Sequence, residues 1–171
     1  MSLIIEEITR QHNRKSFSCG VKELNEFLQH QARQKNAKQI SKTYVACENR
    51  EPNDIIGYYT LTGYSITIPP THKYYQKYPH PLSAVKLARL AVAQSYQNQS
   101  LGEKLLIDAI NRTVLVADQI SAIGLFVDPM NSKIKPFYQQ YGFMPADSGN
   151  NDKLEMWLPI KNCIEVASCL L

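Results

Sequence analysis

The stretch that decides the fold of this 171-residue chain is Leu87-Ala-Arg-Leu-Ala-Val-Ala93, followed by Tyr96-Gln-Asn-Gln-Ser-Leu-Gly-Glu-Lys-Leu-Leu106. The first run has the length and composition of a buried strand, and residues 101–117 repeat apolar residues with helical spacing. A short polar loop that keeps one glycine, Gly102, joins the two. A strand that leads through such a loop into a helix gathers backbone N–H groups at the positive end of the helix dipole. The sequence therefore predicts a phosphate-binding loop over residues 97–103.

The other elements follow an order typical of an α+β fold, a mixed and mostly antiparallel sheet with helices on both faces. A second helix is expected to begin near Ser18–Gly20 and to end by Lys38, and a third is expected over Lys133–Tyr141 with Ser132 as its N-cap. Pro69–Pro81 reads as an irregular loop and Asn49–Asn53 as a turn. The expected strands are Leu3–Ile8, Thr43–Glu48, Ile55–Ile68, Leu87–Ala93, Ala122–Val127 and Lys153–Pro159. We expect one domain over residues 1–160 and an apolar tail over 161–171.

Composition narrows the class of protein. The chain has no run of eighteen apolar residues, so no membrane span is expected, and its first residues are acidic where a signal peptide is basic. Its four cysteines form no close pair, which favours reduced thiols in the cytoplasm over disulfides or a metal site. The net charge of +4 lies entirely within residues 1–42, where eight Lys and Arg face four acids. Such asymmetry suits a surface that binds a polyanion, although a solvated helix face gives the same pattern.

Three motifs resemble those of one known family. The loop Gln97-Asn-Gln-Ser-Leu-Gly102 is similar to the Gln/Arg-x-x-Gly-x-Gly/Ala acyl-CoA loop of the GNAT acetyltransferases, with Ser100 in place of the first glycine. Phe17-Ser-Cys-Gly20 and Phe137-Tyr-Gln-Gln-Tyr-Gly-Phe143 resemble segments of the GNAT toxins of bacterial toxin–antitoxin pairs. This resemblance implies a GNAT fold, acetyl-CoA as acetyl donor and no metal. It also implies acetylation of the amino group of aminoacyl-tRNA, a ribbon-helix-helix antitoxin as partner, and a homodimer.

The resemblance assigns roles to particular residues. Tyr138 would protonate the departing CoA thiolate, and the phenol pKa of about 10 fits this because the group is protonated at neutral pH. Backbone N–H groups of the loop would bind the pyrophosphate; Asn98 enters the left-handed region readily, whereas Ser100 does so with more difficulty. The expected acetyl-CoA contacts are Leu90, Ala91, Val92, Gln97, Asn98, Gln99, Ser100, Leu101, Gly102 and Glu103.

The general base and the acceptor site are less sharply defined by the sequence. Glu103, Asp108, Asp128, His72 and His80 are candidate bases by position alone. We expect none to be essential, because an α-amino group is partly neutral at cellular pH.

For the acceptor, Arg89 on the central strand and Arg33, Lys35 and Lys38 of the basic segment are expected to contact substrate. A buried ion pair is the alternative for Arg89. Loop tyrosines such as Tyr74, Tyr75 and Tyr78 offer stacking surfaces or have no function. Two other functions stay open: a GNAT enzyme for a protein N-terminus or small amine, and a non-catalytic module that binds CoA or a partner.

Overall fold

The computed structural model describes residues 2–68, 70–71, 73, 76–146 and 154–169. The chain forms two compact units, the first from Met1–Thr62 with Ala88–Ala109 and the second from Gly63–Leu87 with Ile110–Leu171. Strand β4 (Leu82–Val92) and helix α3 (Leu101–Ile120) contribute residues to both units. The prediction of one domain over 1–160 stays a prediction.

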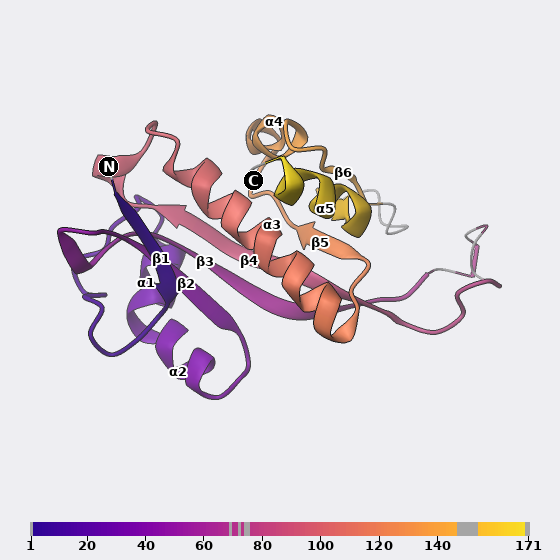
Figure 1. Cartoon of the computed structure of the whole chain (residues 1–171), viewed down its shortest axis with the longest axis horizontal. Helices are drawn as coiled ribbons and strands as arrows, with labels where there is room; N and C mark the ends of the chain where they lie inside the picture. Colours follow the sequence, from indigo (N-terminus) through magenta and orange to yellow (C-terminus); the bar gives the residue numbers. More distant parts are fainter. Residues whose placement is uncertain (1, 69, 72, 74–75, 147–153, 170–171) are drawn as a thin grey trace. The chain divides into compact units, whose positions relative to one another are not determined.

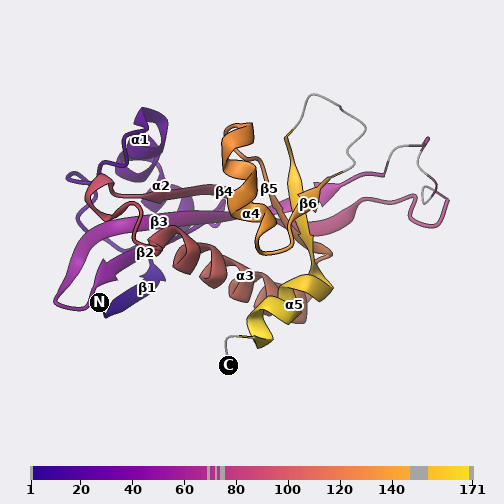
Figure 2. The same ribbon diagram turned by 90° about the horizontal axis from the view of Figure 1, so that it is seen from above.

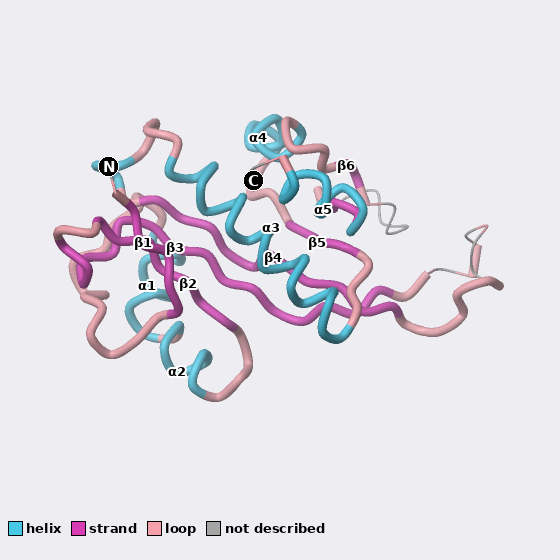
Figure 3. Tube along the Cα trace, in the orientation of Figure 1, coloured by secondary structure: helices cyan, strands magenta, loops and turns pink. Residues whose placement is uncertain are grey.

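The first unit is built on strands in the order β1-β2-β3-β4. Strands β1 (Leu3–Glu7) and β2 (Lys42–Glu48) pair antiparallel, as do β2 and β3 (Glu51–Ile66). Helices α1 (Lys22–His30) and α2 (Ala32–Ala37) lie between β1 and β2 in the sequence, and the 3₁₀ turn η1 (Gln94–Tyr96) follows β4. Figure 3 shows the loop that leads from this turn into α3.

Two adjacent tyrosines of β3 show how this unit is layered. Successive side chains of a strand point to opposite faces of the sheet. Tyr58 donates its hydroxyl to the Leu24 carbonyl of α1 at 2.7 Å, whereas Tyr59 donates to Asp108 of α3 at 2.5 Å. Helix α1 and the first half of α3 therefore cover opposite faces, an arrangement that can be followed in Figure 2.

The second unit carries the strand order β4-β5-β7-β6. Strand β5 (Gly124–Val127) runs parallel to β4, and β7 (Met156–Pro159) runs antiparallel to both β5 and β6 (Met144–Pro145). All four residues of β5 are buried, as the continuous apolar run predicted. Turn η2 (Ser132–Ile134), α4 (Lys135–Gln139) and α5 (Ile160–Ser168) complete the unit, and α5 packs on β5 and β7.

The predicted α+β fold with a mixed sheet is confirmed, and the apolar tail forms helix α5 as far as it is described. Within the described residues, no helix combines the length and hydropathy that crossing a bilayer requires.

Several predicted boundaries are wrong for identifiable reasons. The helix expected over 18–38 begins only at Lys22, because the Asn25 side chain accepts the Cys19 N–H at 2.9 Å and holds the preceding residues in a turn. It is also divided at Gln31, whose φ of −125° is not helical. Strand β3 starts at Glu51 inside the expected turn, since two register shifts let pairing continue to the Glu48–Glu51 pair.

The predictions also missed or misplaced smaller features. The cap of the segment before α4 is Asn131, which accepts the Lys133 N–H at 3.0 Å, and Ser132 is the first residue of η2. Strand β6 was not predicted, since two residues carry no periodicity. Part of the loop over 69–81 and residue Lys153 lie outside the described residues.

Candidate functional site

The loop between η1 and α3 has an unusual backbone. Asn98 and Ser100 have φ values of 61° and 63°, in the left-handed region, whereas Gln99 between them does not. Alternation of this kind turns successive N–H groups toward one concave side, the arrangement called a nest, which binds anions. Asn98 thus adopts the expected conformation. Ser100 adopts it too, although its Cβ makes this conformation unfavourable by about 1 kcal/mol.

The N–H groups of this loop are available to a ligand. Helix α3 begins at Leu101, and the Lys104 N–H closes its first turn on the Ser100 carbonyl at 3.2 Å. The first N–H groups of any helix have no acceptor within the helix. In the described part of the chain, the N–H groups from Asn98 to Glu103 have no hydrogen-bond acceptor. They form a run of donors at the positive end of a 20-residue helix.

Gln97 does not share this arrangement. Its N–H points to the Gln94 carbonyl at 3.4 Å, and its side-chain amide donates to the carbonyls of Cys19 at 2.9 Å and Val92 at 3.0 Å. One amide group therefore joins the end of β4, the loop and the N-terminal segment. We call this set of contacts the Gln97 clamp. It gives Gln97 a role in holding the loop that the sequence did not reveal.

The Phe-Ser-Cys-Gly motif supplies the other side of the clamp. The Gln94 N–H donates to the Ser18 carbonyl at 2.9 Å, and Phe17 packs edge-on against Tyr58 in the core. Gly20 has a φ of 90°, and a Cβ there would lie 3.1 Å from Nε2 of Gln94. The motif therefore forms a turn that packs against Gln94, just before the loop.

The residues of β4 that were predicted to contact acetyl-CoA lie at the end of the strand, just before the loop. Ala91 is buried, and Leu90 and Val92 are half-buried. A Cβ on Gly57 of β3 would meet Leu105 of α3 at 2.9 Å and the Ala91 carbonyl at 3.2 Å. The missing side chain thus lets the first turns of α3 lie close to the sheet, which fixes the direction of its N–H groups.

Two of the residues predicted to contact substrate meet at one aromatic ring. The Arg89 guanidinium lies 3.7 Å from the centroid of Phe27, and the Lys35 ammonium lies 5.6 Å from the same centroid. Among the described residues Arg89 makes this cation–π contact and not the ion pair that was the alternative from the sequence. Arg33 is half-buried, with an Nε that has no partner among the described residues, and Lys38 is exposed.

Tyr138 lies in the second unit, on the short helix α4. Its ring packs edge-on against Phe137 and Phe143, and burial raises the pKa of its hydroxyl to about 12. The hydroxyl has no hydrogen-bond partner among the described residues. Helix α4 ends at Gln139, and Gly142, with a φ of 97°, turns the chain after it so that Phe143 reaches the ring. A phenol in this environment keeps its proton at neutral pH and has a free O–H to donate.

The candidate general bases have other surroundings. Asp108 accepts the Tyr59 hydroxyl, and Asp128 pairs with the Lys86 ammonium at 2.8 Å. Glu103 is half-buried in the first turn of α3, and His80 is exposed.

Some of the predicted site residues fall beyond what the structure describes. His72, Tyr74 and Tyr75 lie outside the described residues, whereas Tyr78 is described and exposed. Among the residues that are described, no three His, Cys, Asp or Glu side chains gather as metal ligands would.

Comparison with known proteins matches this geometry to a family. Residues 39–145 match the model of the acetyltransferase (GNAT) domain. A tRNA-acetylating toxin of Mycobacterium tuberculosis strain H37Rv is 28% identical over 148 residues, which cover 86% of this chain and 86% of that protein.

Solved structures agree with this match. A tyrosine-to-phenylalanine variant of the toxin AtaT, bound to the C-terminus of the antitoxin AtaR and to acetyl-CoA, superimposes with a TM-score of 0.82 at 27% identity. That alignment covers 97% of this chain and 98% of the other. AtaT complexed with acetyl-methionyl-tRNAfMet gives a TM-score of 0.83 at 29% identity, covering 96% and 98%. Since the domain model spans more than half of its length, the chain belongs to the acetyltransferase (GNAT) domain family.

Proposed function

We propose that this protein is a toxin that transfers the acetyl group of acetyl-CoA to the amino group of aminoacyl-tRNA and so blocks translation. The observation that carries the proposal is the run of free N–H groups from Asn98 to Glu103 at the start of α3. A pyrophosphate is the part of acetyl-CoA that such donors recognise, because they offer positive charge without a cationic side chain.

The residues present fit this ligand. The loop donors of residues 98–103 would hold the pyrophosphate, and the end of β4 near Val92 would offer backbone groups to the thioester. Acetyl-CoA supplies an activated acetyl group whose transfer leaves a thiolate. Gln97 keeps the loop and the end of β4 together through its two side-chain hydrogen bonds.

Tyr138 is proposed as the proton donor. In the overall reaction a carbon–nitrogen bond forms, the carbon–sulfur bond breaks and the thiolate takes up a proton. Burial raises the pKa of Tyr138 to about 12, so at neutral pH the hydroxyl is protonated while part of the amine is neutral, and it donates no hydrogen bond within the described residues. An α-amino group with a pKa of about 8 loses its own proton to water, so we assign no side-chain base.

Two observations support aminoacyl-tRNA as the acceptor: the positive charge of the N-terminal segment and the RNA substrates of similar proteins. Arg89 and Lys35 meet at Phe27, and the excess positive charge of the chain lies within residues 1–42. A basic surface of this kind binds phosphates of RNA, and its affinity falls steeply with salt. The relative from M. tuberculosis is named as a tRNA-acetylating toxin, and AtaT has been solved with an acetylated aminoacyl-tRNA.

We infer the partners and the compartment from the same sources. AtaT binds its antitoxin AtaR, and we propose that this protein is held inactive by an antitoxin of the ribbon-helix-helix type. We also propose a homodimer. Charged tRNA and the free thiols of Cys19, Cys47 and Cys163 favour a cytoplasmic location.

The acceptor class can be tested by the release of CoA thiol from acetyl-CoA. Charged tRNA should support release at low salt, whereas deacylated tRNA, free amino acids and peptides with a free N-terminus should not. Release should slow as salt rises, because fewer phosphates remain bound. Equal release with free amino acids or peptides would contradict the proposal and favour an enzyme for small amines or protein N-termini.

A further inference from the structure

Lys86 of β4 binds two carboxylates within the second unit. Its Nζ atom lies 2.8 Å from the Asp128 carboxylate and 2.7 Å from the Glu155 carboxylate. The side chain of Lys86 is 14% exposed and that of Glu155 is 4% exposed, so water and salt screen this pair weakly. Burial lowers the pKa of Lys86, but the hydrogen bonds and charges of its two partners outweigh burial and raise the pKa above its usual value. The side chain is therefore an ammonium at neutral pH.

The two carboxylates face each other across neighbouring strands. Val127, the last residue of β5, pairs with Met156, the first residue of β7. Asp128 and Glu155 are the next residues beyond this antiparallel pair, and both side chains lie on the side of the sheet where Lys86 reaches them. Like charges at opposed positions of two strands repel each other and destabilise the pairing. Lys86 supplies the positive charge that lets the two carboxylates lie together.

Tyr64 of β3 completes this group of side chains, which we call the Lys86 network. Its hydroxyl donates to the Glu155 carboxylate at 2.6 Å, and the Lys86 ammonium lies 4.4 Å from the centroid of its ring. A cation beside two carboxylates and an aromatic ring is held from several sides, and removal of the cation would leave a buried carboxylate without its charge partner. The network thus joins β3 and β4 to the residues that flank β5 and β7.

These flanking residues are also the two ends of the segment that carries Tyr138. The segment spans residues 129–154 and includes α4 and β6, which can be followed in Figure 2. The aromatic partners of the Tyr138 ring belong to the same segment. The backbone also joins the segment to Glu155, whose carbonyl accepts the Ala146 N–H at 2.9 Å. The position of the Tyr138 hydroxyl therefore depends on how Asp128 and Glu155 are held.

We propose that Lys86 is a positioning residue for acetyl transfer, which holds Asp128 and Glu155 together and so keeps the Tyr138 hydroxyl in place to protonate the departing thiolate. The proposal rests on the proposed function, because it takes Tyr138 as the proton donor. Proton transfer depends on exact placement, and a displacement of about 1 Å can lower a rate by about a hundredfold. Lys86 acts through Tyr138 and does not contact the reacting atoms.

Steady-state kinetics with acetyl-CoA and charged tRNA test this role. Lys86→Met keeps the length of the side chain but leaves the two carboxylates without a cation. Its kcat should fall about tenfold to a hundredfold, while its affinity for acetyl-CoA in a calorimetric titration stays unchanged. Lys86→Arg keeps the charge and should lose less activity. Lys161→Met, at an exposed lysine of α5, removes the same charge in the same unit and should keep the wild-type kcat.

A double-mutant cycle with Tyr138→Phe separates a positioning role from a general loss of structure. If Lys86 acts through the Tyr138 hydroxyl, Lys86→Met should lower kcat in the wild-type background but change it less than about twofold in the Tyr138→Phe background. An equal loss in both backgrounds would overturn the proposal. A Lys86→Met variant as active as the wild type would overturn it as well.

A second variant keeps the test decisive if Lys86→Met folds poorly. Combining Lys86→Met with Glu155→Gln removes the repulsion between the carboxylates, so the melting temperature should return toward that of the wild type. The same cycle with Tyr138→Phe then applies to this variant, and an equal loss in both backgrounds would again overturn the role of Lys86. A wild type that transfers no acetyl group, or a Tyr138→Phe variant as active as the wild type, would instead contradict the proposed function and this role with it.

Discussion

The loop of residues 97–103 and the segment from α4 to Phe143 present two different kinds of chemistry. In the loop, the groups offered to a ligand are backbone N–H groups, and the side chain of Gln97 points inward to Cys19 and Val92. In the second segment the group offered to a ligand is one side-chain hydroxyl, that of Tyr138. The turn at Gly142 brings Phe143 against the Tyr138 ring and so fixes its position.

This difference predicts how each region responds to substitution. A site made of backbone groups depends on conformation, so it tolerates a change of side chain that keeps the left-handed φ values, as Ser100 does in place of glycine. A site made of one hydroxyl tolerates no replacement that removes this atom. The predictions below separate these two kinds of dependence.

The largest effect is expected for Tyr138→Phe. The ring keeps its packing against Phe137 and Phe143, so the free energy of unfolding should change by less than about 0.5 kcal/mol. Without the proton donor, kcat should fall by about 10²- to 10³-fold, with unchanged affinity for acetyl-CoA. Steady-state kinetics and calorimetry measure both quantities. Tyr141→Phe is the matched control and should keep its activity; equal activity of the two variants would refute the assignment.

A smaller effect is expected for Gln97→Ala. The substitution removes both side-chain bonds of the clamp and leaves the carbonyls of Cys19 and Val92 without that donor. The loop should then sample other conformations, and affinity for acetyl-CoA should fall about tenfold, as the loss of about 1.4 kcal/mol implies. Gln97→Glu keeps the size but cannot donate, so it should be at least as weak. The exposed Gln34→Ala serves as control, and binding as tight as the wild type's in both Gln97 variants would exclude the clamp.

Ser100→Gly should have a modest effect of the opposite sign. Glycine adopts a φ of 63° without the strain of a Cβ, about 1 kcal/mol, so a larger fraction of the unliganded protein should hold the loop conformation that binds pyrophosphate. Affinity for acetyl-CoA should rise by a few-fold in a calorimetric titration. Ser100→Ala keeps the strain and should show no gain. Weaker binding by the glycine variant would mean that the serine hydroxyl contacts the ligand.

The smallest effect is expected from pH: kcat should not decline as the pH rises through 10. Burial raises the pKa of Tyr138 to about 12, above the usual 10 for a phenol, so the donor keeps its proton as pH rises through 10. The rate should rise as the acceptor amine loses its proton near pH 8 and then stay constant to about pH 10.5. A decline in kcat centred below pH 10 would place the proton donor on another group.

The raised pKa of Tyr138 also makes the stability of the folded state depend on pH. A phenol whose pKa is raised on folding stabilises the folded state fully below pH 10, and this contribution is lost as pH rises toward 12.

Much of the fold could be predicted because its signals are local. The apolar spacing of α3, the buried run of β5 and the pattern around Gly142 each lie within about twenty residues. The helix and the strand formed close to the expected bounds, whereas the helix expected before Gly142 is shorter and follows a 3₁₀ turn. The positive φ of Asn98 also follows from its residue type. Local patterns therefore located the loop and Tyr138.

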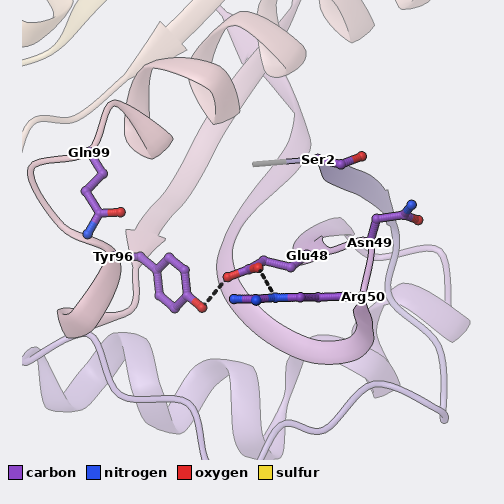
Figure 4. A pocket seen from close by; sticks show the side chains of 6 residues that line it. All are labelled: Ser2, Glu48, Asn49, Arg50, Tyr96 and Gln99. Atoms are coloured by element: carbon purple, nitrogen blue, oxygen red, sulfur yellow. Dashed lines mark hydrogen bonds and ion pairs between the residues drawn. The ribbon is translucent and has the colours of Figure 1, made fainter.

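The contacts that hold the loop could not be predicted in this way. Gln97 and Cys19 are 78 residues apart in the sequence, and no local pattern around either residue predicts the hydrogen bond between them. The Glu48–Tyr96 hydrogen bond spans 48 residues of sequence and belongs to a pocket built from three separate segments (Figure 4). Arg89 was likewise placed on the right strand, but its cation–π partner Phe27 comes from another element.

The most direct test of the account is mass spectrometry of the aminoacyl-adenosine released by nuclease from charged tRNA after incubation with the protein and acetyl-CoA. The account predicts one added acetyl group on the α-amino nitrogen of the amino acid, formed by the wild type and strongly reduced with Tyr138→Phe. Charged tRNA that stays unmodified while acetyl-CoA is bound, or an acetyl group found on another acceptor, would contradict it.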